Sequence, residues 1–318
     1  LKANLCENKK KYIMKLFSLD KTNKLETIKE FPFRLEKEIQ NLTEQNITTI
    51  FNLDFVRSEF SINNFRLDTL AFDKETSSFV IIEYKRDKNF SVIDQGYAYL
   101  SLMLNNKADF ILEYNENKKN TLKRSDVDWS QSRVVFVSPS FTTYQKEAIN
   151  FKDLPIELWE VKRYNNQTLS YHQIQTSGAQ ESVKTISRED TTIEKVSKEI
   201  KVYTEQEHID KGSEEIKELY EQLKSAILNL VDLELKPKKL YIAFVASTNV
   251  VDVHIQRSQL KIWINLLKGE LNDPKGICRD VSSMGHWGNG DYEIAINTDE
   301  DLEYIMSLIK QSLRKNKK

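Results

Sequence analysis

Cysteine, histidine and long apolar runs are all scarce in this chain of 318 residues. It has two cysteines and four histidines, and Cys6 and Cys278 lack the spacing of a zinc site. This usage argues against a disulfide scaffold or a histidine-metal enzyme and fits a reducing cytoplasm. No run of about eighteen apolar residues occurs, so we expect no membrane span, and residues 1–17 lack the apolar segment of a signal peptide. We therefore expect a cytoplasmic protein whose folded part begins near Met14.

An excess of charge of either sign is missing as well. The formal net charge is −1, although 30% of the residues are charged. No field of one sign covers the surface, so any surface that binds phosphates must be local, for example at Lys85, Arg86 and Lys88. Hydrophobic residues make up 39% of the chain, which is enough for the cores of two domains at this length.

The apolar periodicity of residues 14–175 predicts an α/β domain, because segments with helical spacing alternate with segments of strand character. Residues 107–114 (KADFILEY) fit either the end of a helix or a separate strand, and we prefer the strand. Residues 133–139 form a nearly continuous apolar run, which is typical of a buried central strand. The other expected elements are helices at 35–42, 94–104 and 143–151 and strands at 51–60, 65–72, 78–86, 156–163 and 168–173.

A change of composition marks the end of this domain. Residues 176–202 lack aromatic side chains and are rich in Ser, Thr, Lys and Glu, which predicts a polar linker with a helical portion around residues 193–200. Thr204 and Glu207 have the spacing of a capping box, so order should resume there. Residues 203–318 predict a smaller α+β domain, with helices at 216–230 and from 299 onward and strands at 239–247, 250–256, 260–267 and 291–297.

Residues 65–99 contain the chemically most informative pattern. Side chains alternate between the two faces of a strand, so Glu83 and Lys85 lie on one face of the strand at 78–86. A hairpin with the preceding strand would bring Asp68 beside Glu83. Burying such charged side chains is costly unless they bind a metal ion or form an ion pair with each other. Two carboxylates on neighbouring strands suit a hard divalent cation such as Mg²⁺.

Asp68, followed fifteen positions later by Glu83-Tyr84-Lys85, resembles the PD-(D/E)xK signature of restriction enzymes and of many repair and defence nucleases. Leu67 stands in place of the proline. Gln95 and Tyr99 form a Q-x-x-x-Y pattern that resembles the RecB-type branch of these nucleases. The resemblance implies a restriction-endonuclease-like fold, in which helices flank a mixed sheet.

Residues 31–42 resemble the first helix of the same branch, which supplies a further glutamate. We choose Glu38, with Glu36 as the alternative, because one sequence cannot fix the rotation of the helix. The resemblance then implies metal ligands at Asp68, Glu83 and the carbonyl of Tyr84, catalytic residues at Lys85, Glu38, Gln95 and Tyr99, and nucleic-acid contacts at Arg86 and Lys88.

These residues predict a nuclease that hydrolyses phosphodiester bonds with Mg²⁺, or with Mn²⁺ in its place. DNA is the expected substrate, defence or repair the expected setting, and a homodimer compatible with the family. Two other interpretations stay open: a nucleic-acid-binding protein without catalysis, and an interaction protein that uses the nuclease fold to recruit partners. Glu83 and Lys85 would then be an ordinary surface ion pair.

Residues 203–318 resemble an uncharacterised domain that follows RecB-like nucleases in prokaryotic chains often labelled "predicted transport protein". Its markers here are Arg279-Asp280-Val281 and the GHWGNGD segment at 285–291. The transport label finds no support, because we expect no membrane span. Trp287 could stack on a base and Arg279 could pair with a phosphate, which would make this domain a specificity or sensing module. Alternatively, GHWGNGD is a rigid turn whose tryptophan fills the core of its own domain.

Overall fold

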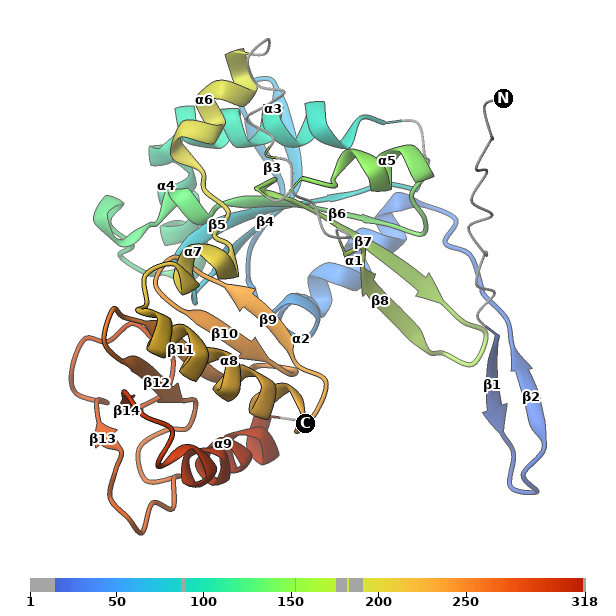
Figure 1. Ribbon diagram of the computed structural model, residues 1–318. Coiled ribbons are helices and arrows are strands. Elements are labelled where there is room, and N and C mark those ends of the chain that lie inside the picture. Colours follow the sequence, from blue (N-terminus) through green and yellow to red (C-terminus); the bar gives the residue numbers. More distant parts are fainter. Residues whose placement is uncertain (1–14, 87–89, 152, 176–181, 183–190, 317–318) are drawn as a thin grey trace, which may run out of the picture.

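Two six-stranded sheets organise the chain, one in each of two units (Figure 1). The structure is a computed structural model, and it describes residues 15–86, 90–151, 153–175, 182 and 191–316. The first sheet has the order β3-β4-β5-β6-β7-β8; β5, β6 and β7 pair in parallel and the other neighbours antiparallel. Its strands are β3 (Asp54–Ile62), β4 (Phe65–Asp73), β5 (Ser78–Tyr84), β6 (Arg133–Ser138), β7 (Ile156–Arg163) and β8 (Leu169–Gln173).

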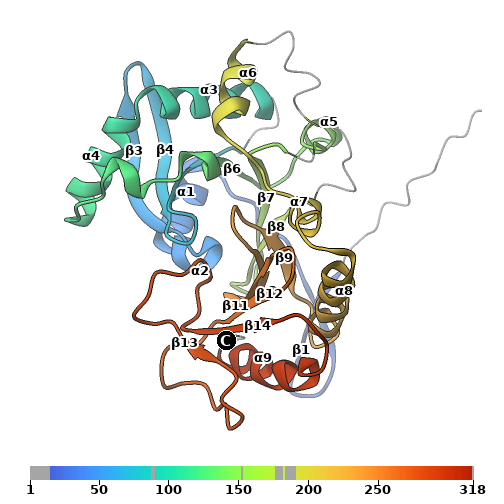
Figure 2. The ribbon, with the colours of Figure 1, turned by 60° about the vertical axis from the view of Figure 1, so that its left-hand side comes forward.

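Helices cover both faces of this sheet (Figures 1 and 2). On one face, Phe79 and Ile81 of β5 share a core with the helices α3, α4 and α6; on the other, Val80 and Ile82 share a core with α1 and α2. Because β5 is buried on both faces, its sequence is apolar almost throughout. The helices are α1 (Glu36–Gln45), α2 (Ile47–Phe51), α3 (Val92–Asn105), α4 (Lys107–Lys118), α5 (Thr143–Ala148) and α6 (Thr191–Glu199).

The hairpin of β1 (Leu16–Leu19) and β2 (Leu25–Ile28) forms a sheet of its own beside β7 and β8 (Figure 1). Among the described residues, the one isolated bridge joins Glu30, just after the hairpin, to Tyr164, just after β7. Two short 3-10 turns, Arg124–Asp126 and Trp129–Gln131, lead into β6.

The strand that we preferred at residues 107–114 is wrong, because these residues belong to α4. Phe110 and Tyr114 are one helical turn apart, so both face the sheet. Their rings pack against Phe60 and Phe72, with centroids 5.2 and 4.8 Å apart. The apolar pattern of this segment alone fits either a strand or a helix, and the aromatic packing favours the helix.

The second unit is a smaller α+β domain. Its antiparallel sheet has the order β13-β14-β12-β11-β10-β9. The helices α8 and α9 pack over it around a separate hydrophobic core. The elements are α7 (Glu205–Ile209), α8 (Glu214–Leu228), β9 (Glu234–Pro237), β10 (Ile242–Val245), β11 (Asn249–Ile255), β12 (Leu260–Ile264), β13 (Arg279–Asp280), β14 (Tyr292–Ile296) and α9 (Leu302–Asn316).

Part of the predicted linker is built into the first unit. The expected helix around residues 193–200 is present as α6, which ends at Glu199, but Ile193, Val196 and Ile200 are buried in the core beside α3. Their spacing forms an apolar stripe, which packs once α3 offers a surface. The capping box of Thr204 and Glu207 is present and begins α7. The remainder of the predicted linker, 176–181 and 183–190, lies outside the described residues.

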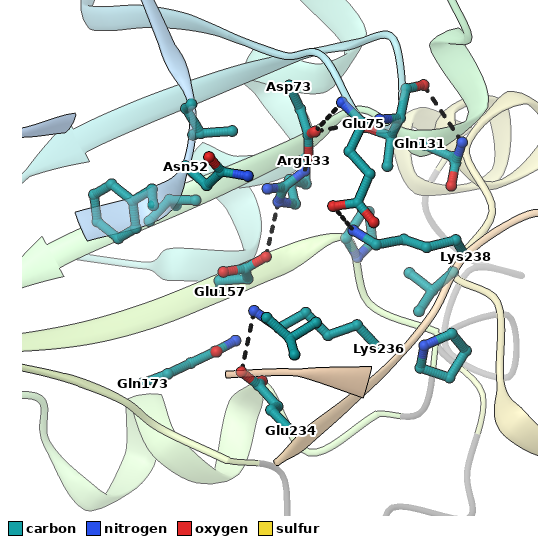
Figure 3. A pocket seen from close by; sticks show the side chains of 18 of the residues that line it. Asn52, Asp73, Glu75, Gln131, Arg133, Glu157, Gln173, Glu234, Lys236 and Lys238 are labelled. Carbon is teal, nitrogen blue, oxygen red and sulfur yellow. Dashed lines mark hydrogen bonds and ion pairs between the residues drawn. The ribbon is translucent and has the colours of Figure 1, made fainter. Parts of the chain in front are cut away.

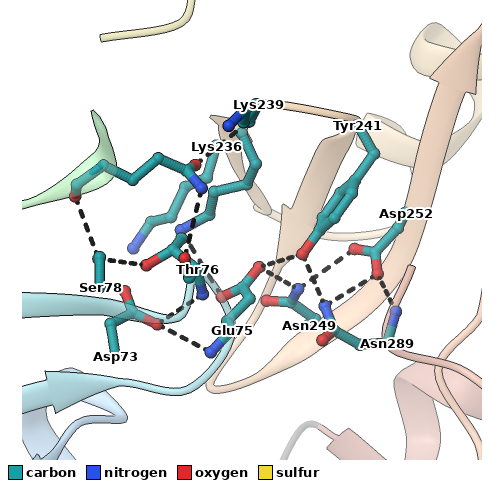
Figure 4. A network of polar contacts seen from close by, with 12 residues as sticks. Asp73, Glu75, Thr76, Ser78, Lys236, Lys239, Tyr241, Asn249, Asp252 and Asn289 are labelled. Carbon is teal, nitrogen blue, oxygen red and sulfur yellow. Dashed lines mark hydrogen bonds and ion pairs between the residues drawn. The ribbon is translucent and has the colours of Figure 1, made fainter. Parts of the chain in front are cut away.

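The predicted fold class is confirmed: a mixed sheet flanked by helices is followed by a smaller α+β unit. The two units meet at the turn between β4 and β5, where Glu75 reaches the second unit (Figure 4). Its carboxylate accepts hydrogen bonds from Tyr241 Oη at 3.2 Å and Asn249 Nδ2 at 2.8 Å. In the part of the chain that is described, no helix combines the length and apolarity that a bilayer span requires.

Candidate active site

The polar residues predicted on β4 and β5 lie together. The pairing of Thr69 with Ile82 sets Asp68 beside Glu83 on the adjacent strand. Asp68 Oδ2 accepts a hydrogen bond from the backbone N–H of Tyr84 at 3.0 Å. Lys85 Nζ donates to Glu83 Oε1 at 2.7 Å. The antiparallel hairpin therefore brings two carboxylates and an ammonium to one place.

The helix α3 adds two more of the predicted residues. It begins after Ser91, whose hydroxyl accepts from the backbone N–H of Asp94, so its first turn lies near the end of β5. Gln95 Nε2 donates to Glu83 Oε1 at 3.0 Å and to Tyr99 Oη at 2.8 Å. Residues four apart share a helix face, so the Q-x-x-x-Y spacing presents both side chains to the strand.

Burial and like charge make the site electrostatically strained. The pKa of Asp68 is raised to about 6, first by burial and then by the charge of Glu83, while the Tyr84 N–H and Lys85 act in the opposite direction. Burial, followed by the charge of Glu83, also raises the pKa of Tyr99 well above its usual value. Glu83 is 3% exposed, and its Oε2 has no hydrogen-bond partner among the described residues.

These observations fit a divalent cation. The partly buried Asp68 and the buried Glu83 repel each other, and one oxygen of Glu83 is left without a donor, so a cation there would relieve both costs. The described residues contain no group of three or more His, Cys, Asp or Glu side chains that could hold a metal. Asp68 and Glu83 are the two carboxylates that could hold an ion here, and Mg²⁺ can be bound by one or two carboxylates together with waters. The role of the Tyr84 carbonyl stays a prediction.

The two candidate glutamates of α1 have different partners in the structure. Glu38 Oε2 pairs with Arg163 of β7 at 3.1 Å, and no contact within the described ranges joins Glu38 to Asp68 or Glu83. Glu36, the alternative, accepts a hydrogen bond from the backbone N–H of Arg86 at 2.9 Å. Successive helix residues are rotated by about 100°, so positions two apart point in widely different directions. The helix thus turns Glu36, rather than Glu38, toward the segment after Lys85.

Gln40, one turn after Glu36, is the side chain of α1 that reaches Asp68. Its Nε2 donates to the backbone carbonyl of Asp68 at 2.9 Å.

The predicted nucleic-acid contacts are spread over the molecule. Arg86 follows the cluster directly, and its Nη1 donates to the carbonyl of Arg34 at 2.7 Å. Lys88 lies outside the described residues. Arg279 lies in the second unit, where its Nη2 pairs with Glu293 at 2.6 Å. Trp287 also belongs to that unit, and its ring meets His254 edge-on with centroids 4.7 Å apart.

The GHWGNGD segment does not place its tryptophan in the core. Trp287 is 49% exposed, whereas Gly288 and Gly290 lie against β12. A Cβ at Gly290 would come within 1.9 Å of the Ile264 carbonyl oxygen, and one at Gly288 within 2.5 Å of the Trp263 ring. These two glycines are therefore required by close packing, and the exposed Trp287 ring leaves the predicted stacking role open.

Glu59 is a carboxylate near the cluster that the sequence reasoning missed. The pairs Ser58 with Thr69 and Phe60 with Leu67 flank it, so Glu59 stands across β3 and β4 from Asp68. Its charge contributes to the raised pKa of Asp68. The signal was available, because a two-residue turn at Asn63 and Asn64 sets this register.

A cavity of about 600 Å³ lies between the two units, at the other end of the sheet (Figure 3). Arg133 at the start of β6 pairs there with Asp73 and Glu157, at 2.9 and 2.8 Å. The second unit contributes Lys236 and Lys238. Glu83 and Lys85 lie at the end of β5, which runs parallel to β6, so the cavity and the cluster lie at opposite ends of the strands.

Comparison with known proteins gives one relative of high similarity. An uncharacterized protein of Haemophilus influenzae is 55% identical over 302 residues, which cover 95% of this chain and 100% of the relative. Residues 205–315 match a domain of unknown function (DUF5655), which corresponds to the second unit.

Among solved structures, the chain is similar to a repair endonuclease from Pyrococcus abyssi, with 21% identity, a TM-score of 0.22 and coverage of 38% of this chain and 45% of that one. It is also similar to EndoMS in a complex with dsDNA, with 17% identity, a TM-score of 0.23 and coverage of 42% and 47%. The chain thus spans less than half of each of these two structures.

Proposed function

The chain belongs to the same family as the uncharacterized Haemophilus influenzae protein, and we propose that it is a metal-dependent nuclease acting on phosphodiester bonds, with DNA as the expected substrate. The observation that carries the proposal is the unsatisfied Oε2 of the buried Glu83 next to the carboxylate of Asp68. Lys85 and Gln95, which contact the other oxygen of Glu83, complete the arrangement.

Each residue then has a defined task. Asp68 and Glu83 would hold Mg²⁺ or Mn²⁺, and when bound the ion supplies a water of lowered pKa and positive charge against the scissile phosphate. Lys85 would orient the attacking water and stabilise the charge that develops on the phosphate. Gln95 donates to Glu83 Oε1 and to Tyr99 Oη, so this pair would leave Glu83 Oε2 available to an ion. The second unit, whose DNA-contact residues remain a proposal, would choose the substrate.

Replacing the lysine separates catalysis from binding. Lys85→Ala is expected to lower cleavage by at least about a hundredfold, since one charged or hydrogen-bonding group at the reacting phosphate contributes that much. Binding of DNA should stay near the wild-type level. The measurement is cleavage of single-stranded, double-stranded and RNA substrates with Mg²⁺ or Mn²⁺, with EDTA as the metal-free control.

A matched control is Lys74→Ala, which removes an exposed lysine that pairs with Asp54 at 2.7 Å at the other end of the same strands. It should cleave like the wild type. Unchanged cleavage by the Lys85→Ala variant would exclude the assignment. If the wild type binds DNA but does not cut it under any of these conditions, the protein is a binding protein on a nuclease fold.

A further inference from the structure

Glu59 adopts a backbone conformation that is unusual in the middle of a strand. Its φ is +54°, in the left-handed region, although it lies within β3. Residues other than glycine adopt this region at a cost, and such conformations concentrate at functional sites. Since Glu59 stands across from Asp68 in the register of β3 and β4, this conformation places a third carboxylate at the rim of the candidate active site.

Glu59 forms ion pairs with two basic side chains from different elements. Lys37 Nζ of α1 lies 2.8 Å from Glu59 Oε1, and Arg66 Nε of β4 lies 2.8 Å from Glu59 Oε2. The two basic side chains are 51% and 67% exposed. The hydrogen bond from Lys37 is the largest cause of a lowered pKa at Glu59, which keeps the glutamate charged and both cations in place.

This group is connected to the candidate active site. Lys37 Nζ also donates to Gln40 Oε1 at 3.0 Å, and Gln40 Nε2 donates to the carbonyl oxygen of Asp68 at 2.9 Å. Arg66 Nε forms an ion pair with Glu59 Oε2, an oxygen that has no hydrogen-bond partner among the described residues, and the guanidinium has five N–H donors. Lys37 has three donors and two acceptors here, so a donor remains on each cation.

We propose that Lys37 and Arg66 bind the phosphate backbone of the substrate beside the scissile bond, and that Glu59 is the positioning residue that holds them there. The inference rests on the proposed function and names the surface by which that site meets its substrate. Cations already held in place lose less conformational freedom on binding, and phosphate contacts of this kind fix the register of a nucleic acid. The chain has no overall positive charge, so such a local pair would carry much of the phosphate affinity.

The test is the salt dependence of DNA binding, measured by fluorescence anisotropy with a labelled duplex and with Ca²⁺ in place of Mg²⁺. The double variant Lys37→Gln/Arg66→Gln should weaken binding by about tenfold or more at low salt. It should also lower the slope of log affinity against log salt by about 2, one unit for each lost phosphate contact. In cleavage assays KM should rise more than kcat falls.

Glu59→Gln tests the positioning role, because it keeps the shape and removes the charge that gathers the two cations. It should raise KM with a smaller change in salt slope than the double variant, and the melting temperature should confirm folding of every variant. The matched control is Lys74→Gln, which removes an exposed, ion-paired lysine at the other end of β4. It should bind like the wild type.

The outcomes separate the inference from the proposed function. A wild type that cleaves DNA, with a double variant that keeps its affinity and salt slope, overturns the inference alone. The inference is likewise overturned if Lys74→Gln weakens binding as much as the double variant, because the weaker binding would then follow from the loss of any positive charge. A wild type that neither binds nor cleaves nucleic acid overturns both.

Discussion

Asp68 determines how the candidate active site responds to pH. In the folded protein its pKa is about 6, against 3.8 for the free side chain. Between these values the folded state holds a proton that the unfolded state releases, so the stability contributed by the neutral form is lost as pH rises from about 4 to 6. Above pH 6 the full cost of the buried charge is present, roughly 3 kcal/mol at 1.4 kcal/mol per pKa unit.

A bound cation should remove this cost, which predicts competition between metal and protons. Mg²⁺ or Mn²⁺ is expected to raise the melting temperature at pH 7.5, and the increment should shrink at pH 5, where Asp68 is protonated. Asp68→Asn should be more stable than the wild type without metal at pH 7.5, and should show no increment with metal. Thermal unfolding in buffers with and without the metal measures both effects.

Asp54→Asn serves as the control, because Asp54 lies on the neighbouring strand and pairs with the exposed Lys74. The metal should raise the melting temperature of this variant as much as that of the wild type. An increment of wild-type size in the Asp68→Asn protein would show that the metal binds elsewhere.

At the scale of single elements, the rotation of α1 has a consequence for activity. Glu36 holds the backbone N–H of Arg86, the residue after Lys85, whereas Glu38 pairs with Arg163. Glu36→Ala, which removes the acceptor of the Arg86 N–H, should therefore lower cleavage by about tenfold, as loss of a group that orients a site residue does. Glu38→Gln should leave cleavage near wild type and cost less than about 1 kcal/mol of stability, as expected for a partly exposed ion pair. Cleavage rates and unfolding free energies, measured for both variants, test these expectations. A larger loss of cleavage in the Glu38 variant than in the Glu36 variant would contradict the observed helix rotation.

Much of the cluster could be predicted because short-range geometry fixes it. Strand alternation puts Glu83 and Lys85 on one face, and the helical repeat puts Gln95 and Tyr99 on one face of α3. Only the hairpin was needed to add Asp68. These five residues lie together, as the pattern predicts, but Gln95 contacts Glu83 and Tyr99, whereas we expected it to hold Lys85 or to contact the nucleic acid.

Features that depend on the packing of whole elements were harder to predict. The rotation of α1 is set by the buried Ile39 and by the contact of Gln40 with Asp68, and neither can be inferred from α1 alone. Residues 107–114 fit both the helical and the strand periodicity, and their helical form is stabilised by contact with Phe60 and Phe72. Glu59 lay within reach of a hairpin argument, but its left-handed backbone has no signature in the sequence.

At the scale of the molecule, the two units are joined at the tip of the strands that carry the candidate active site. Glu75, in the turn between β4 and β5, contacts Tyr241 and Asn249 of the second unit (Figure 4) and also Lys238 (Figure 3). Behind them lies Asp252, which is buried and accepts hydrogen bonds from the backbone and side chain of Asn289 in the GHWGNGD segment. That segment therefore has a structural role: it anchors the polar network beneath the junction.

Asp252 makes this junction sensitive to pH. Burial first, and then the charge of Glu75, raise its pKa to about 7, while the Asn289 backbone, Asn289 side chain and Asn265 side chain act in the opposite direction. Because the folded-state pKa lies above the free value of 3.8, the free energy of unfolding should fall as pH rises from about 4 to 7 and level off above 7. Neutral Asp252 does not repel Glu75, so the junction is tightest below pH 7.

Glu75→Gln tests this coupling. The amide removes the charge but keeps an acceptor for Tyr241, so the pKa of Asp252 should fall and the pH dependence should become shallower, by roughly 1 kcal/mol between pH 5 and 8. Chemical unfolding across that range measures it, and subtraction from the wild type cancels the titration of Asp68. Glu234→Gln, which breaks the ion pair with Lys236 in the same cavity, should retain the wild-type slope. An unchanged slope in Glu75→Gln would mean that burial alone sets the pKa of Asp252, and that the turn carrying Glu75 joins the units without sensing charge.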